Sequence, residues 1–344
     1  MVRITNIKIY ENISNEEVFK IAINKYKINH NDILSWQISK KSIDARKKDD
    51  VHFNYSIDLK LKNESHYKKL KLIKEFKMPK INLNNKENKK VVIIGAGPSG
   101  LFAALTLVQN GLSPIIIEQG EPVEKRKETV DIFRREGKLN PLSNVQFGEG
   151  GAGTFSDGKL TTGINSPFCK KVLEEFVHFG APEEILYLSK PHIGTDLLID
   201  VIRNIREYII SMGGKFLFNT KAIDFKIENN VIKAVIVKNE SSTEEIKASH
   251  VIAAIGHSSR DTFEKLYECN IYMEPKNFSV GVRIEHLQEE INKAQYGTLT
   301  KLKLPPAEYK LAYHSPSGRS CYTFCMCPGR SCNGFFKRKK YYSK

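Results

Sequence analysis

The most constraining feature of this chain is an apolar run followed at once by three closely spaced glycines. Residues 91–100 read Val-Val-Ile-Ile-Gly-Ala-Gly-Pro-Ser-Gly. The first glycine permits a tight turn, the second lets a pyrophosphate approach the backbone, and the third lets a helix pack closely on the strand. These glycines also interrupt an apolar stretch over residues 91–108 that is just long enough to mimic a membrane span. The pattern predicts a strand, a dinucleotide-binding turn and a helix over residues 98–110.

A second apolar strand is predicted over residues 114–118, and it ends in an acidic side chain. Glu118 lies 18 residues after Gly100, where a carboxylate can accept a hydrogen bond from a ribose hydroxyl. The free N–H groups and the dipole of the helix N-terminus stabilise phosphate charge. A packing turn of an α/β fold is the weaker alternative. We expect this unit to bind the cofactor through Gly95, Ala96, Gly97, Pro98, Ser99, Gly100, Glu118 and Gln119.

The downstream elements favour FAD over NAD as the dinucleotide. The predicted elements after residue 118 follow in this order: a charged helix (121–136), a glycine-rich irregular stretch (140–165), a long amphipathic helix (195–212), three strands that resemble an inserted meander (215–219, 222–227 and 231–237) and a late buried strand (250–255). FAD-binding proteins of the glutathione-reductase superfamily have this order, and the late strand with its Gly256 turn resembles their second short FAD motif. The predicted fold class is α/β: an incomplete glutathione-reductase-type, Rossmann-like FAD-binding domain with a small N-terminal α+β module.

A second glycine pattern lies in the irregular stretch. Residues 148–153 (Gly-Glu-Gly-Gly-Ala-Gly) also match the dinucleotide fingerprint, but no apolar strand precedes them and residues 154–158 cannot begin a normal helix. We interpret residues 150–158 as a loop of backbone amides that forms the flavin-facing wall. The further cofactor-binding candidates are Arg126, Gly150, Gly151, Gly153, Thr154, Gly158, Lys159, Ala222, Ala254, Ile255 and Gly256.

Several segments together resemble one family, the uncharacterised FAD-dependent dehydrogenases of bacteria, also described as NAD(FAD)-utilising dehydrogenases. The segments are Ser42-Ile-Asp-Ala-Arg-Lys47, the 95–100 turn, Asn140–Gly148, Gly150–Leu160, Lys190-Pro-His-Ile-Gly-Thr195 and Ala254–Phe263. The resemblance extends from about residue 3 to Gly329. It implies FAD binding through Gly95, Gly97, Gly100 and Glu118, and an oxidoreductase activity whose substrate it does not identify.

The sequence departs from that family after Gly329. Residues 330–344 are basic and lack element periodicity, where the family continues with a glycine turn, a substrate-side region and a last FAD motif. We expect a frameshift or a truncation at this point. Cys325 and Cys327 could form a redox pair or part of a zinc site with Cys321 and Cys332, but a C-x-C disulfide is strained. Structural or incidental cysteines, and no metal, are the preferred interpretation.

The net charge of +15 is concentrated at the two ends of the chain. Residues 1–90 hold 21 basic and 11 acidic side chains (+10), residues 330–344 hold six basic and no acidic ones (+6), and the remainder is nearly neutral (−1). Residues 1–85 are predicted to form an α+β module with a basic turn at 40–48, followed by a polar linker at 80–90. A solvated basic face is preferred to a nucleic-acid site there, because no stacking aromatic lies within the turn.

The resulting prediction is an FAD-dependent oxidoreductase that transfers hydride or electrons through the flavin, with NAD(P)H as a candidate electron donor. The catalytic residues stay unassigned; His192, His257 and Arg260 lie beside expected FAD loops. Residues 90–329 would form the FAD-binding domain. No secretory signal is visible, the cysteine usage is that of a cytosolic protein, and a cytoplasmic protein without a membrane partner is expected. The alternatives are a non-catalytic FAD-binding fragment, or a nucleic-acid-binding module at residues 1–85 attached to a flavin domain.

Overall fold

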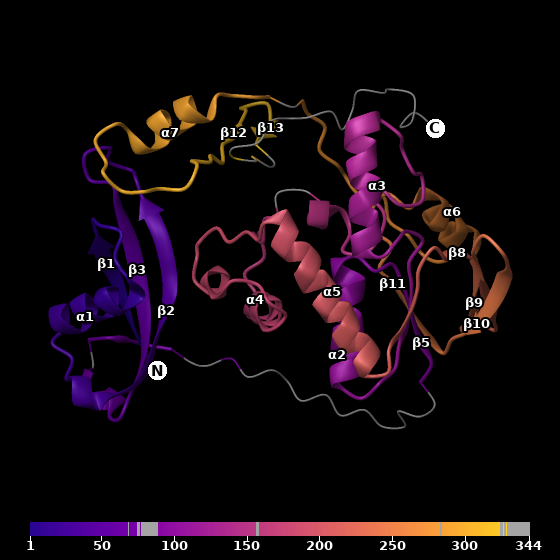
Figure 1. The fold of residues 1–344 in the computed structure, drawn as a ribbon, viewed down its shortest axis with the longest axis horizontal. Coiled ribbons are helices and arrows are strands. Elements are labelled where there is room, and N and C mark those ends of the chain that lie inside the picture. Colours follow the sequence, from indigo (N-terminus) through magenta and orange to yellow (C-terminus); the bar gives the residue numbers. More distant parts are fainter. Residues whose placement is uncertain are drawn as a thin grey trace.

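A computed structural model gives the arrangement of the chain (Figure 1). It describes residues 1–67, 69–73, 76, 89–155, 158–282, 284–323, 326 and 328. Most of the expected linker, Ser156 and Asp157 of the glycine loop, Cys325, Cys327 and the 330–344 tail lie outside the described residues.

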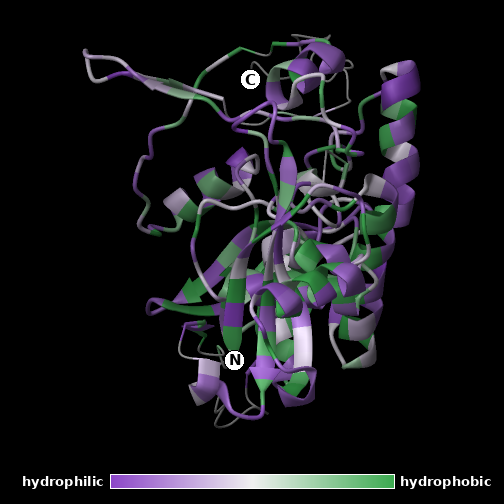
Figure 2. Ribbon diagram, turned by 90° about the vertical axis from the view of Figure 1, so that its left-hand side faces the viewer, coloured by the Kyte–Doolittle hydropathy of each residue, from purple (hydrophilic) through white to green (hydrophobic). Residues whose placement is uncertain are grey.

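The N-terminal module is a four-stranded antiparallel sheet with one helix packed on it. The strand order is β2-β3-β1-β4, and the elements are β1 (Val2–Ile9), α1 (Asn15–Lys25), β2 (Ile33–Asp44), β3 (His52–Leu61) and β4 (Lys71–Leu72). The Ser14 side chain caps α1 by accepting a hydrogen bond from the Glu17 N–H, and the Glu17 carboxylate accepts one from the Ser14 N–H, which together form a capping box. The apolar residues at every second position of β3, among them Tyr55 and Ile57, belong to one core with the apolar residues of α1. Figure 2 shows hydrophobic positions gathered on the strands of this module.

The predicted basic turn at 40–48 is partly wrong, because β2 continues to Asp44. Lys40 and Lys41 therefore lie in a strand, and the Lys41 ammonium lies 4.8 Å from the centre of the Phe53 ring. The Lys41 N–H donates to the Tyr187 carbonyl at 2.7 Å, and the Ser189 N–H donates to the Lys41 carbonyl at 3.0 Å. These bonds join the module to the second domain.

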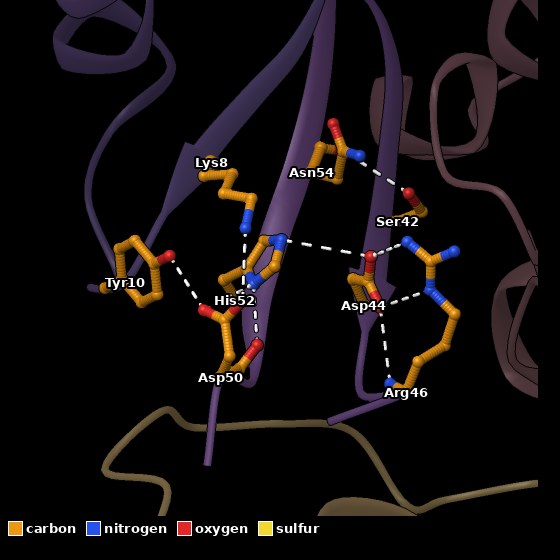
Figure 3. Close-up of polar contacts among 8 residues, drawn as sticks. All are labelled: Lys8, Tyr10, Ser42, Asp44, Arg46, Asp50, His52 and Asn54. Carbon is orange, nitrogen blue, oxygen red and sulfur yellow. Dashed lines mark hydrogen bonds and ion pairs between the residues drawn. The ribbon is translucent and has the colours of Figure 1, made fainter. Parts of the chain in front are cut away.

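The Ser42–Lys47 motif forms a polar cluster at the end of this hairpin (Figure 3). The Arg46 guanidinium donates from Nε (2.9 Å) and Nη2 (2.5 Å) to the Asp44 carboxylate and holds the pKa of that carboxyl well below its usual range. Across the hairpin, Tyr10 donates to Asp50 at 2.8 Å, and the buried His52 places Nδ1 2.7 Å from the Asp50 carbonyl. Because a carbonyl only accepts, the Nδ1 of His52 carries a hydrogen. The motif thus closes the hairpin tip.

The second domain is built on a parallel sheet of order β11-β5-β6-β7. Its strands are β5 (Val91–Ile94), β6 (Ile115–Ile117), β7 (Lys215–Leu217) and β11 (His250–Ala253). The helices α2 (Pro98–Gln109), α3 (Val123–Glu136) and α5 (Thr195–Ser211) follow the predicted ranges within two residues. The largest apolar core of the domain includes residues of β5, β6, α2 and α5. The α/β, Rossmann-like fold with a small N-terminal module is confirmed.

The meander is present, but its strands differ from those predicted. The antiparallel sheet has the order β10-β9-β8, with β8 (Lys221–Glu228), β9 (Val231–Lys238) and β10 (Thr243–Lys247). The predicted first strand, β7, instead pairs in parallel with β6. The polar composition of β10 hides it from a pattern search, because its residues are exposed or half-buried.

The remaining elements lie between and beyond these sheets. They are α4 (Phe168–His178), α6 (Arg260–Glu268), α7 (Gln288–Tyr296), β12 (Ala312–His314), β13 (Ser320–Tyr322) and the 3-10 turns His30–Asp32, Glu64–Tyr67, Ala152–Phe155 and Glu183–Leu186. Within the described residues, no helix combines the length and the apolar character that a membrane crossing needs.

Candidate dinucleotide-binding site

A cavity of about 640 Å³ opens where β5, β6 and β11 end. This is the position at which open parallel sheets bind their ligands, because the carboxyl ends of the strands and the following loops meet there. Five segments form its walls: the turn after β5, the end of β6, the glycine-rich loop at residues 146–152, the start of β8, and the loop and helix after β11.

The glycines of the first turn are required by close packing. Gly95 has φ +101°, and a Cβ on it would collide with the Ala254 carbonyl. A Cβ on Gly100 would collide with the Gly95 carbonyl, so the third glycine lets α2 approach the turn. Gly97 is the N-cap of α2, Pro98 is its first residue, and no side chain caps the helix. The N–H groups of the first turn therefore remain available at the cavity wall.

The Glu118 carboxylate connects three turns of the site. It accepts hydrogen bonds from the N–H groups of Ala96 (2.8 Å), Gly120 (2.9 Å) and Gly148 (3.2 Å). Its side chain is buried and lines the cavity. Two carboxylate oxygens offer about four acceptor positions, so about one remains for a further donor.

The Arg126 side chain supports the glycine-rich loop through hydrogen bonds to main-chain carbonyl groups. The guanidinium is fully buried and donates to the carbonyls of Asn144, Val145, Gly148 and Glu149. Burial lowers the pKa of Arg126 to about 10, while the charges of Glu118 and Glu149 oppose that change. The side chain remains charged at neutral pH, and its role in this structure is to shape the 144–149 loop rather than to line the cavity.

A buried ion pair joins the same loop to α3 and α5. Glu149 is fully buried, accepts from the Val123 N–H at 2.7 Å and pairs with Arg206 at 2.6 Å. Arg206 also binds Glu124 at 2.6 Å. Burial raises the pKa of Glu149 to about 7, and the charge of Arg206 opposes that increase.

Most of the predicted cofactor-binding residues meet at this cavity, although they come from five separate parts of the chain. The wall includes Gly95, Gly97, Pro98, Ser99, Glu118, Gln119, Gly151, Ala222, Ala254, Ile255 and Gly256.

The other predicted residues lie outside the cavity wall. Ala96 is buried under the turn and its carbonyl accepts from the Gly150 N–H at 2.9 Å. Gly100 and Arg126 support the turn and the loop as described. Thr154 is buried beneath Gly150, and Gly158 pairs with Ile193 through their main chains. The Lys159 ammonium lies 3.3 Å from the Glu308 carboxylate, and Gly153 belongs to the Ala152–Phe155 turn.

Sequence reasoning missed the far walls of the cavity. They include Gln146, Phe147, Gly148, Thr220, Lys221, Ser258, Ser259, Thr262, Phe263 and Leu266. His257, which the sequence places beside an expected FAD loop, also lines the cavity. Only their position in the sequence could have identified such wall residues. Residues 257–259 directly follow the Gly256 turn, and the carboxyl ends of parallel strands lie at the same edge of a sheet. The main chain of His192 instead forms an isolated antiparallel β-bridge with that of Lys159, and Arg260 is the first residue of α6. Neither residue lines the cavity.

The parallel sheet, the glycine turn at the N-terminus of α2 and the acidic end of β6 define a Rossmann-like dinucleotide-binding protein. More narrowly, residues 88–268 match the FAD binding domain family, and the chain belongs to that family. Residues 277–332 match a family described as FAD-dependent protein, C-terminal domain-like, and residues 1–60 match a domain of unknown function (DUF8436).

Two curated proteins are similar to this chain over different shares of its length. An uncharacterized protein of Clostridium beijerinckii is 44% identical over 337 residues, which are 95% of this chain and 62% of that protein. The chain thus spans about 62% of the length of this curated relative. A D-amino acid dehydrogenase of Helicobacter pylori is 31% identical over 85 residues, 25% of this chain and 20% of that one.

The solved structures that resemble this chain are more distant. Glycine oxidase from Bacillus cereus aligns with 15% identity and a TM-score of 0.34, covering 54% of this chain and 59% of its own. L-amino acid deaminase from Proteus vulgaris aligns with 17% identity and a TM-score of 0.29, covering 57% and 53%. Within the described residues, no group of histidine, cysteine and acidic side chains is arranged to hold a metal ion.

Proposed function

We propose that this chain binds FAD through the cavity at the ends of β5, β6 and β11, and that it serves an FAD-dependent oxidoreductase. The observation that carries the proposal is the convergence of the 95–100 turn, Glu118 and the Gly256 turn on one cavity of about 640 Å³. That volume is within the range of small-molecule and cofactor sites.

The residues present fit the adenosine diphosphate half of FAD. The uncapped N-terminus of α2 supplies N–H donors and a favourable dipole for a diphosphate. Gly97 and Gly151 keep side chains away from that approach; a Cβ on Gly97 would point at the Gly151 Cα, 3.8 Å away. Glu118 has an acceptor position for a ribose hydroxyl, and Phe263 and Leu266 supply apolar surface for an aromatic base.

The bound flavin would supply hydride or electron transfer, and the protein supplies position and electrostatics. In this chain Arg126 and Glu118 fix the 144–149 loop relative to the turn, so the cavity is shaped before any ligand binds. Lys159 and Lys190 meet at Glu308, with ammonium–carboxylate distances of 3.3 and 2.5 Å. This contact holds the loop after Gly158 against the segment near residue 308. The proposed electron donor is NADH or NADPH.

The test is a titration of the purified chain, stripped of nucleotide, with FAD. We expect one FAD per chain, with a perturbed flavin absorbance spectrum, and displacement by ADP but not by riboflavin. Failure to bind FAD would reject the proposed site. Anaerobic addition of NADH or NADPH to the loaded protein then tests the redox role by bleaching of the flavin absorbance.

A second candidate function is FAD binding without turnover. The observation that favours it is that the chain spans about 62% of its Clostridium beijerinckii relative. It predicts the same stoichiometric binding of FAD, but no bleaching by either nicotinamide donor under conditions in which dithionite reduces the flavin fully.

A further inference from the structure

Between α6 and α7 the chain runs outside both large sheets (Figure 1). Residues 277–285 read Asn-Phe-Ser-Val-Gly-Val-Arg-Ile-Glu, with apolar side chains at every second position. Such a two-residue period is typical of a strand with one buried face. We define the apolar strip as Phe278, Val280, Val282 and Ile284.

The apolar strip is exposed rather than buried. Its four side chains are between 69 and 94% exposed. In the part of the chain that the structure describes, its residues belong to no strand pairing. A row of exposed apolar side chains on a backbone that has no strand partner among the described residues is a template for an added strand.

A small, incomplete sheet lies next to the strip. The hydroxyls of Ser279, on the polar side of the segment, and Tyr322 of β13 are in contact. β12 and β13 form a sheet of two strands, and Leu311 and Tyr313 are 62 and 65% exposed. Two strands alone rarely make a stable sheet, and three or more with a shared apolar face are needed. The apolar strip and the β12–β13 hairpin therefore both need a further strand to form a stable sheet.

The Clostridium beijerinckii relative is longer than its match to this chain. Its match accounts for 95% of this chain but only 62% of its own length, so over a third of its polypeptide has no counterpart here. The match to the FAD-dependent protein, C-terminal domain-like family begins at residue 277, where the strip begins.

We propose that the apolar strip pairs with a β-strand of the polypeptide that this relative carries outside its match, and that this partner completes one sheet with β12 and β13. Recognition combines main-chain hydrogen bonds along the strip with an apolar face that meets Phe278, Val280, Val282 and Ile284. FAD binding is not required for this docking, so the proposal stands or fails independently of the proposed function.

The first test compares hydrogen exchange in two intact proteins. In this chain alone, the peptide covering residues 277–287 should exchange rapidly. In the full-length relative, the aligned peptide should be protected. Equal, rapid exchange in both proteins overturns the proposal.

The second test co-expresses the full 344-residue chain with the unmatched polypeptide of the relative and measures the complex that is recovered. Val282→Lys should weaken it by about tenfold or more, because a buried ammonium would replace an apolar contact. Asn277→Lys, a matched charge on the polar side, should leave it within about twofold. Since Val282 is 94% exposed, the variant chain should fold as wild type.

Three outcomes would overturn the proposal: no complex, equal effects of the two lysines, or a concentration-dependent dimer of the chain alone that Val282→Lys abolishes. The last outcome would assign the strip to a second copy of this chain instead.

Discussion

Glu118 Oε2 accepts a hydrogen bond from the main-chain N–H of Ala96 at 2.8 Å, so the acidic end of β6 holds the glycine turn that follows β5. The other oxygen accepts from Gly120 and Gly148. Glu118, which is predicted to accept a hydrogen bond from a ribose hydroxyl, therefore also sets the distance between the 95–100 turn and the glycine-rich loop. Structural and ligand-binding consequences of changing it should appear together.

Glu118→Gln should destabilise the FAD-binding domain by about 1–3 kcal/mol, because an amide group would face N–H donors that now meet a carboxylate. FAD affinity should fall as well. Urea unfolding and FAD titration measure the two effects. Glu128→Gln, which alters an exposed pair with Lys125, is the control and should change neither. Wild-type stability in Glu118→Gln would show that the three hydrogen bonds are dispensable.

Gly100→Ala should destabilise the domain by about 1–3 kcal/mol, because the new methyl group overlaps the Gly95 carbonyl and pushes α2 away from the turn. FAD binding should weaken in parallel. Gly163→Ala is the matched control, since nothing lies within 4 Å of its added Cβ. Thermal unfolding and flavin content compare the two variants. If they behave alike, close helix packing is not the reason for the third glycine.

Arg126→Lys should loosen the 144–149 loop while keeping a positive charge. A lysine has one nitrogen with three donors, whereas Arg126 donates to four carbonyls in a planar arrangement. Left unpaired, those buried carbonyls should cost about 1–3 kcal/mol. Hydrogen exchange of the loop peptides should rise. Arg135→Lys, at an exposed position of α3, provides the comparison, and equal exchange in the two variants would contradict this role.

The pH dependence of stability should carry a contribution from Glu149. The folded state keeps a proton on this carboxyl up to about pH 7, whereas the ordinary pKa is 4.5. Its stabilising contribution is therefore full below pH 4.5 and is lost as the pH rises toward 7, with a slope of up to about 1.4 kcal/mol per pH unit.

Glu149→Gln, which stays neutral throughout, should remove this slope. Urea unfolding of wild type and variant between pH 5 and pH 8 measures the difference, which should favour the variant increasingly as the pH rises. Parallel stability curves would mean that Arg206 keeps Glu149 ionised across the whole range.

Local patterns predicted the central unit of the fold well. The apolar residues of β5, the glycine turn and α2 follow one another directly along the chain. Such features depend on neighbouring residues, so spacing alone reveals them. β10 and the partner of β7 depend on pairing between distant strands, and β10 has no apolar period that could reveal it.

The candidate site divides in the same way. From the sequence alone came the α/β class, the glycine turn and the acidic residue after the second strand, because their steric and hydrogen-bonding requirements are local. Only the tertiary structure decided that residues 146–148, Thr220, Lys221 and the segment at 257–266 close the cavity. It also placed Arg126 beneath a loop instead of in the cavity wall. The physical reason is that parallel strands bring their carboxyl ends to one edge of the sheet, whatever the distance between them along the chain.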